Sequence, residues 1–185
     1  MNIESSSKKI CEISKKYNES KYAYKSSSGE GIYVVKHLNT LAKEITAKLN
    51  LADSGGYSTL ISKGKSNLPK VLWVAIVPTG RTPATSMSVA ICFGRRGEGL
   101  VAGVMVPKTG AAHTINTVDR RSSELKVDID GDKSNTKYNN CYVNPKEWLY
   151  DNIDDGSLMA HLRSSLDQLA LLSKDVQNYD AYYGR

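Results

Sequence analysis

Short apolar runs rich in β-branched residues fill the middle of the chain. Each is bounded by glycine, proline or charged residues, which is the pattern of strands packed into one sheet. The predicted strands are Tyr57–Ile61, Val71–Val77, Met87–Phe93 and Leu100–Val106. Because side chains alternate between the two faces of a strand, Trp73 should share a face with Ala75 and Val77, and the intervening residues should point the other way. Only one of these faces needs to be core.

Apolar residues at helical spacing appear toward both ends of the chain. Leu38–Leu49 has the clearest apolar stripe, and Ser5–Tyr17 and Leu158–Leu172 have similar ones. Helices near both termini with strands between them predict an α+β fold, in which a curved, mostly antiparallel sheet is flanked by helices. We expect Pro145–Trp148 to start a short helical or turn segment, with Trp148 in the core.

The length and composition suit one folded domain. With 185 residues and 40% apolar content, the chain can build a hydrophobic core. We expect a single domain over residues 1–175 and a tail, or a linker to a further domain, over residues 176–185. The apolar runs are too short to cross a bilayer, and the polar N-terminus lacks the apolar segment of a secretory signal. A cytoplasmic location without membrane contact is therefore expected.

The charge is unevenly distributed along the chain. Residues 1–51 carry nine Lys or Arg against five Asp or Glu, residues 52–110 seven against two, and residues 111–185 nine against twelve, within a net charge of +6. The basic excess therefore falls on the first helices and on most of the predicted sheet. One basic face suits contact with nucleic-acid phosphates, although a modest positive balance is more often only a solvated surface.

Two loops between the predicted strands concentrate this charge. Ser62–Asn67 precedes the strand that carries Trp73, and Gly94–Gly97 joins the next two strands. As donors to phosphates or base edges, the two loops offer Lys63, Lys65, Ser66, Asn67, Arg95 and Arg96. Gly64–Ser66 imitates the end of a nucleotide-binding P-loop, but Thr59 stands where that loop needs glycine, and a strand follows where it needs a helix. We therefore expect no nucleotide and no other cofactor.

The first of these loops and the two strands behind it resemble a known family. Ser62–Asn67, Leu72–Ile76 and Ser86–Phe93 are similar to the N-terminal DNA-binding domain of McrB-type modification-dependent restriction proteins. The family pattern is a glycine-rich loop ending in Gly-Asn, a short spacer, Pro-Trp and two apolar strands. Here Ser66-Asn67 replaces Gly-Asn, and Leu72-Trp73 replaces Pro-Trp.

The resemblance implies a module that flips a methylated cytosine out of the duplex into a pocket. It places Trp73 at the pocket tryptophan, with Tyr138 on the opposite side of the base. Ser88 and Cys92 fall at pocket positions where the family has bulkier side chains, so a bulkier modified base would fit. Lys65 stands where the family inserts an aromatic residue, and a lysine can contact phosphates or base edges but cannot stack. Flipping costs a few kcal/mol, which stacking and hydrogen bonds in the pocket must offset.

The resemblance also implies the partners of such a module. They are double-stranded DNA with modified cytosine, and the GTPase motor and nuclease subunit of a restriction complex that acts in phage defence. No nucleotide-hydrolysis motif occurs in this sequence. The module itself is therefore expected not to be an enzyme.

Two other functions remain open. Asp119, Glu124 and Lys126 resemble the acid and Glu-x-Lys arrangement of restriction-type nucleases, in which two carboxylates hold Mg²⁺ and the lysine assists an attacking water. Glu98 is an alternative second carboxylate, and a solvent-facing strand that starts near Glu124 is the simpler interpretation. The other function is that of a protein-interaction module, which would be indifferent to DNA and to salt.

Tyrosines in the polar loop after the first helix are a further candidate. Tyr22 and Tyr24, with Lys21 and Lys25, could stack on bases, but loop tyrosines more often pack on the nearest helix. The three cysteines contain no close pair and the three histidines have no metal-ligand spacing. No metal site is therefore expected.

Overall fold

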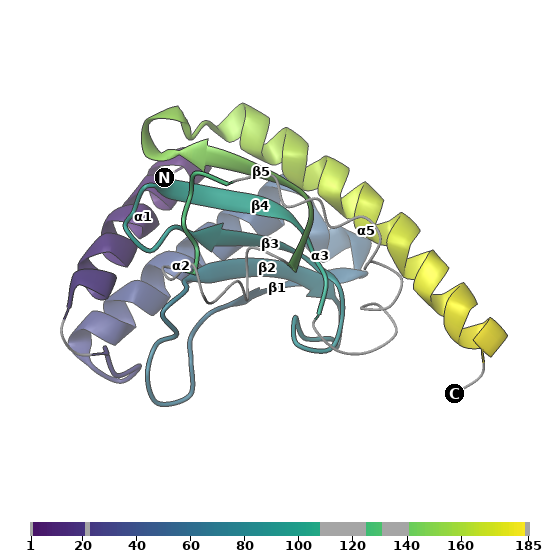
Figure 1. Ribbon diagram of the computed structural model, residues 1–185, viewed down its shortest axis with the longest axis horizontal. Coiled ribbons are helices and arrows are strands. Elements are labelled where there is room, and N and C mark those ends of the chain that lie inside the picture. The colour runs from purple at the N-terminus through teal and green to yellow at the C-terminus, as the bar shows by residue number, and fades with distance from the viewer. Residues whose placement is uncertain (1, 21–22, 108–124, 131–140, 184–185) are drawn as a thin grey trace.

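An antiparallel sheet of five strands organises the molecule. The computed structural model describes residues 2–20, 23–107, 125–130 and 141–183. Its elements are α1 (Ile3–Glu19), α2 (Gly29–Lys48), α3 (Leu51–Ser54), β1 (Tyr57–Ile61), β2 (Trp73–Pro78), β3 (Ser88–Phe93), β4 (Gly99–Met105), β5 (Tyr142–Leu149), η2 (Tyr150–Asn152) and α5 (Asp155–Tyr183). Each strand pairs antiparallel with the next one in the chain (Figure 1). The predicted α+β class, with helices near both termini, is confirmed.

The long helices α1, α2 and α5 pack on one face of the sheet (Figure 1). Their buried stripes meet every second side chain of the strands in one hydrophobic cluster, to which the sheet contributes Val74, Ile76, Val89, Ile91 and Leu100. Leu38, Leu41 and Ile45 of α2 are fully buried there. The apolar stripe read from the sequence is thus the core face of that helix.

The opposite face of the sheet carries Trp73, as the alternation predicts, and is called the Trp73 face below. Its side chains form smaller apolar clusters, separate from the core under the helices. Val127 and Ile129, from an irregular segment ahead of β5, are fully buried in the cluster that contains Cys92 and is flanked by Trp73. Most strand side chains on this second face are therefore buried as well, and Trp73 is one of its partly exposed side chains.

A capping side chain and a close backbone contact explain why α2 starts at Gly29, well before the predicted Leu38. The Ser28 hydroxyl accepts a hydrogen bond from the N–H of Gly31, as an N-cap residue should. A Cβ at Gly31 would lie 2.1 Å from the carbonyl oxygen of Lys25. Glycine is therefore needed at this position for the preceding loop to fold back against the helix.

The second half of the chain differs from the prediction in two elements. Pro145–Trp148 lies within β5 and not in a helical or turn segment, although Trp148 is buried as expected. Because β5 is an edge strand, the missing N–H of proline is tolerated there. The prediction of a strand that starts near Glu124 is also wrong for residues 125–130, the part of it that the structure describes, because these residues are irregular.

The last helix is longer than its apolar stripe indicated. α5 runs past Leu172 to Tyr183 and extends beyond the sheet (Figure 1), so residues 176–183 of the expected tail are helical. None of the helices in the described ranges combines the length and the apolar composition that a membrane span requires.

Candidate nucleic-acid interface

Both basic loops lie at the same end of the sheet. One connects β1 to β2 and the other connects β3 to β4, and in an antiparallel meander these two connections leave from the same end. The connection from α1 to α2 lies there too, at the lower left of Figure 1. Asn18 links these parts, because its side-chain amide donates to the carbonyl oxygen of Lys70 (3.3 Å) while its side-chain oxygen accepts from Nε of Arg95 (3.0 Å).

Residues 23–28 and 62–70, called the paired loops below, are joined by hydrogen bonds. The backbone N–H of Ser26 donates to the carbonyl oxygen of Ser66 at 2.9 Å. The hydroxyl of Ser26 donates to the carbonyl oxygen of Lys63, also at 2.9 Å. The segment before α2 therefore holds the basic loop at two points.

Two tyrosines fix the base of the paired loops. The N–H of Leu68 donates to the carbonyl oxygen of Tyr24 at 3.0 Å, and the hydroxyl of Tyr17 donates to the carbonyl oxygen of Leu68 at 2.6 Å. The rings of Tyr17 and Tyr24 lie 5.0 Å apart, and Tyr24 packs against the main core. The expectation that a loop tyrosine packs on the nearest helix is confirmed for Tyr24, whereas Lys21 and Tyr22 lie outside the described residues.

A tight turn shapes the tip of the basic loop. Gly64 has a φ of +64°, and a Cβ there would lie 2.0 Å from the carbonyl oxygen of Asn67. Only glycine combines this backbone conformation with such a close approach. The turn leaves the side chains of Lys63, Lys65, Ser66 and Asn67 exposed, as their predicted role in DNA contact requires.

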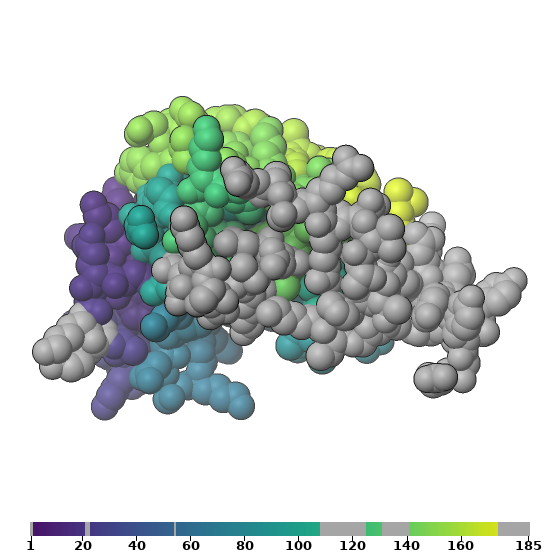
Figure 2. Space-filling model, in the orientation of Figure 1, coloured from purple at the N-terminus to yellow at the C-terminus, as the bar shows by residue number. Residues whose placement is uncertain are grey.

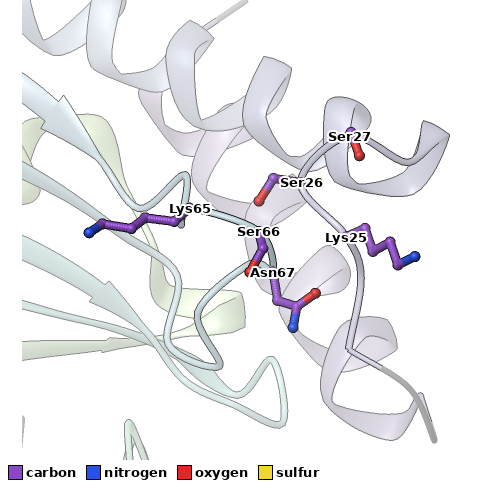
Figure 3. A pocket seen from close by; sticks show the side chains of 6 residues that line it. All are labelled: Lys25, Ser26, Ser27, Lys65, Ser66 and Asn67. Atoms are coloured by element: carbon purple, nitrogen blue, oxygen red, sulfur yellow. The ribbon is translucent and has the colours of Figure 1, made fainter.

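A pocket of about 500 Å³ lies between the paired loops and is lined by Lys25, Ser26, Ser27, Lys65, Ser66 and Asn67 (Figure 3). This lining contains no acidic side chain, and no ion pair of the described residues includes either lysine. In Figure 3 Ser26, Ser66 and Asn67 lie between Lys25 and Lys65, whose side chains point away to opposite sides. The space-filling view shows the β1–β2 connection projecting from the lower left of the molecule (Figure 2).

The two arginines of the β3–β4 turn have different surroundings. Arg95 is partly buried and donates from Nε to Asn18 and from Nη1 to the carbonyl oxygen of Asp130 at 2.7 Å. Arg96 is exposed, and its backbone N–H donates to the carboxylate of Glu98 at 2.8 Å. Of these two predicted DNA contacts, only Arg96 has a guanidinium without an internal partner among the described residues.

Two carboxylates anchor the irregular segment that packs on the Trp73 face. Glu98 accepts from the N–H of Asp128 at 2.8 Å, and Glu147 accepts from the N–H groups of Lys126 and Val127 at 2.7 and 3.0 Å. Glu98, the alternative nuclease ligand, thus binds backbone donors with both oxygens. The described residues contain no group of three His, Cys, Asp or Glu side chains that could hold a metal ion.

Trp73 and Cys92 lie side by side at the basic end of the sheet. They are register partners on β2 and β3, and the N–H of Trp73 donates to the hydroxyl of Ser62 at 2.8 Å, directly at the base of the basic loop. Trp73 is partly exposed, whereas Cys92 is completely buried. Burial raises the pKa of the Cys92 thiol to about 12, so the thiol stays protonated at neutral pH.

Ser88 is too far along its strand to share a pocket with Cys92. The two residues are four apart on β3, or about 13 Å at the usual rise of a strand. One flipped base cannot contact both of them. The hydroxyl oxygen of Ser88 is buried and has no hydrogen-bond partner among the described residues.

Tyr142 is an aromatic neighbour of Cys92 that the sequence did not single out. It is buried in the same cluster, and its hydroxyl lies 3.3 Å from the carbonyl oxygens of Ala90 and Val101. The tyrosine expected at this site, Tyr138, lies outside the described residues. Its place opposite Trp73 therefore stays a prediction.

The predicted nuclease residues are only partly within the described ranges. Asp119 and Glu124 lie outside them, so the nuclease arrangement also stays a prediction, and Lys126 is exposed. By contrast, Ser26 and Lys25 were not expected to form one unit with the basic loop. Their serine-rich segment indicated only a loop, and no local pattern reveals a pairing between residues 37 positions apart.

Comparison with known proteins finds no relative. No protein-family model matches the chain, and no curated protein or solved structure matches it either. Function must therefore be argued from the geometry of the site.

Proposed function

We propose that this chain is a DNA-binding module that recognises a modified cytosine by base flipping. It would act in the cytoplasm as the targeting part of a modification-dependent restriction system. The observation that supports this most directly is the position of Trp73, whose partly exposed indole lies at the end of the sheet that carries both basic loops. Cations that can hold a phosphate backbone and a ring on which a base can stack are therefore adjacent.

The backbone contacts in this proposal come from the loops. Lys63, Lys65 and Arg96 are exposed cations that can bind phosphates, and Ser66 and Asn67 can donate to phosphates or base edges. Arg95 is not part of this set, because its guanidinium bonds Asn18 and Asp130 and so holds the turn in shape.

The base contact in this proposal comes from the Trp73 face. A flipped cytosine would stack on the exposed part of Trp73, and stacking of this kind is worth about 1–3 kcal/mol per base. Cys92 can line the pocket only if side chains around it shift, because it is fully buried in one cluster with Val127 and Ile129. Strand separation, DNA translocation and cleavage would belong to a GTPase motor and a nuclease on other chains.

The test compares binding of one short duplex in four forms, with its target cytosine unmodified, 5-methylated, 5-hydroxymethylated or N4-methylated. The proteins are wild type, Trp73→Ala and Trp73→Phe at fixed salt, each first shown to be folded by circular dichroism. Wild type should prefer one modified duplex. Trp73→Ala should bind that duplex roughly 5- to 150-fold more weakly, the equivalent of the lost stacking energy.

The two variants separate stacking from a loss of structure. Trp73→Phe keeps an aromatic ring and should retain part of the preference, while both variants should bind the unmodified duplex like wild type. Equal binding of all four duplexes by wild type would reduce the function to non-specific DNA binding. If no duplex is bound at all, the protein is not a DNA reader.

A further inference from the structure

The paired loops present polar groups that the proposed base pocket does not use. Lys65 points to one side of the pocket between the loops, and Lys25 points to the other side (Figure 3). Ser66 and Asn67 lie between them. The groups thus form a row that crosses both loops.

The two halves of this row are held in a fixed relation by hydrogen bonds. Ser26 bonds the basic loop through its N–H to Ser66 and through its hydroxyl to Lys63. On the other side, the hydroxyl and N–H of Ser28 donate to the carbonyl oxygen of Lys25, at 2.9 and 3.0 Å. The backbone that carries each lysine is therefore ordered before any ligand binds, which lowers the entropy cost of binding.

The electrostatics of the row favour an anion. Its lysines are exposed, the pocket lining has no acidic member, and the ion pairs of the described residues lie elsewhere, at Lys8, Lys9 and Lys48. The two lysines point to opposite sides, so a single phosphate in the middle could contact both only if both side chains turned inward. A chain of phosphates that runs across the loops can contact both without this change.

We propose that one strand of the DNA backbone crosses the paired loops, with Lys65 and Lys25 bound to two different phosphates and with Ser66 and Asn67 donating between them. This rests on the proposed function for the identity of the ligand. It adds Lys25 as a phosphate-binding residue and Ser26 as a positioning residue, neither of which belongs to the basic loop.

The salt dependence of binding to an unmodified duplex tests the proposal, because phosphate contacts do not depend on the base. The slope of log Kd against log salt falls by about 0.9 for each phosphate that the protein no longer neutralises. Lys25→Ala and Lys65→Ala should each reduce the slope by about that amount, and the double variant by about twice that amount. Lys43→Ala is the matched control, since this exposed lysine of α2 lies about 21 Å along the helix from Gly29 and should leave the slope unchanged.

The role of Ser26 is tested by comparing affinity and slope in the same binding experiment. Ser26→Ala should weaken binding while leaving the slope at its wild-type value, because the protein still neutralises the same number of phosphates and only the ordering of the loops is impaired. Ser26→Thr keeps the hydroxyl and should restore affinity.

The outcomes distinguish this proposal from the proposed function. If wild type and Lys65→Ala behave as expected but Lys25→Ala binds like wild type with the wild-type slope, the crossing strand is wrong and DNA binding stands. The proposal would also be overturned if the slope of log Kd against log salt were no smaller in the double variant than in either single variant. Both lysines would then bind the same phosphate. Failure of wild type to bind any duplex overturns both proposals.

Discussion

The hydroxyl of Tyr17 donates a 2.6 Å hydrogen bond to the carbonyl oxygen of Leu68, and so joins the end of α1 to the base of the basic loop. Both residues are buried. A loop that presents cations to solvent is thus tied to the hydrophobic core one residue after its last exposed donor, Asn67. The tie fixes the backbone at the base of a loop whose side chains are exposed.

Removal of this hydroxyl should destabilise the protein measurably. In Tyr17→Phe the carbonyl oxygen of Leu68 loses its side-chain donor in a buried place, which should cost about 1 kcal/mol of unfolding free energy in urea denaturation. Tyr150→Phe is the matched control, because that hydroxyl bonds Glu12 at an exposed position and should contribute almost nothing. Equal losses in the two variants would contradict a special role for the Tyr17 bond.

The turn at Gly64 should tolerate no side chain. Gly64→Ala combines a positive φ with a Cβ 2.0 Å from a carbonyl oxygen, whereas Gly80→Ala has a φ of +78° but open space around it. We expect Gly80→Ala to cost about 1–2 kcal/mol for the backbone conformation alone, and Gly64→Ala to cost more or to reshape the loop. Denaturation midpoints measure the difference.

The two glycine variants should also differ in their affinity for DNA. Gly80 lies in the β2–β3 connection, at the end of the sheet opposite the basic loops. Gly80→Ala should therefore leave DNA affinity unchanged, and Gly64→Ala should reduce it. A normal affinity in Gly64→Ala would show that the shape of the tip is irrelevant to binding.

The two arginines of the β3–β4 turn should separate stability from DNA binding. Arg95→Ala removes bonds to Asn18 and to the carbonyl oxygen of Asp130, which should lower the unfolding free energy by about 1–3 kcal/mol. Arg96→Ala should change stability by less than about 0.5 kcal/mol, as is usual for an exposed side chain, and should reduce the salt slope of DNA binding by about 0.9. The reverse pattern in denaturation and binding would show that the assignment of the two roles is wrong.

Local periodicity predicted the parts of this fold that depend on it. The face on which Trp73 lies follows from strand alternation, and the buried side of α2 follows from the spacing of its leucines. Both basic loops lie at one end of the sheet simply because consecutive strands form antiparallel hairpins. These features carry most of the proposed DNA contacts.

Features that depend on distant contacts could not be read from the sequence. Gly29 and Gly31 disfavour a helix, yet α2 starts there because the loop before it packs where a Cβ would be. Pro145 argues against a strand, but β5 accepts it at the sheet edge, beside a register irregularity at which Asn144 has a φ of +50°. The bond from Ser26 to Lys63 likewise exists only once the sheet has brought the two loops together.

A partly buried histidine of α5, His161, should make stability depend on pH. Nε2 of His161 lies 3.0 Å from the carbonyl oxygen of Ala102, and its ring packs edge-on against Trp148 with the centroids 5.6 Å apart. Burial lowers the pKa of His161 below its usual 6.5, with a smaller contribution from the charge of Lys146 and against the opposing effect of the bond to Ala102. His37 has its pKa lowered for similar reasons, with burial first and the charges of Lys9 and Lys36 next.

The direction of the effect follows from these lowered values. Each histidine takes up a proton near pH 6.5 in the unfolded chain but only at a lower pH in the folded protein. The contribution of the neutral histidines to the unfolding free energy is therefore fully present above pH 6.5. It is lost as the pH falls through the lower pKa of the folded state. The unfolding free energy of wild type should therefore decrease from about pH 7.5 to about pH 5.5.

Single substitutions assign the two contributions to this pH dependence. His161→Gln should flatten the pH profile of the unfolding free energy in part, His37→Gln should flatten it by a separate amount, and the profile of the double variant should be flatter than that of either single variant. The carboxylate of Asp154 cannot account for the slope, because its pKa is lowered from 3.8 by hydrogen bonds from Ser157. Urea denaturation at a series of pH values measures the profiles. A His161→Gln profile as steep as that of wild type would show that this histidine does not resist protonation in the folded protein.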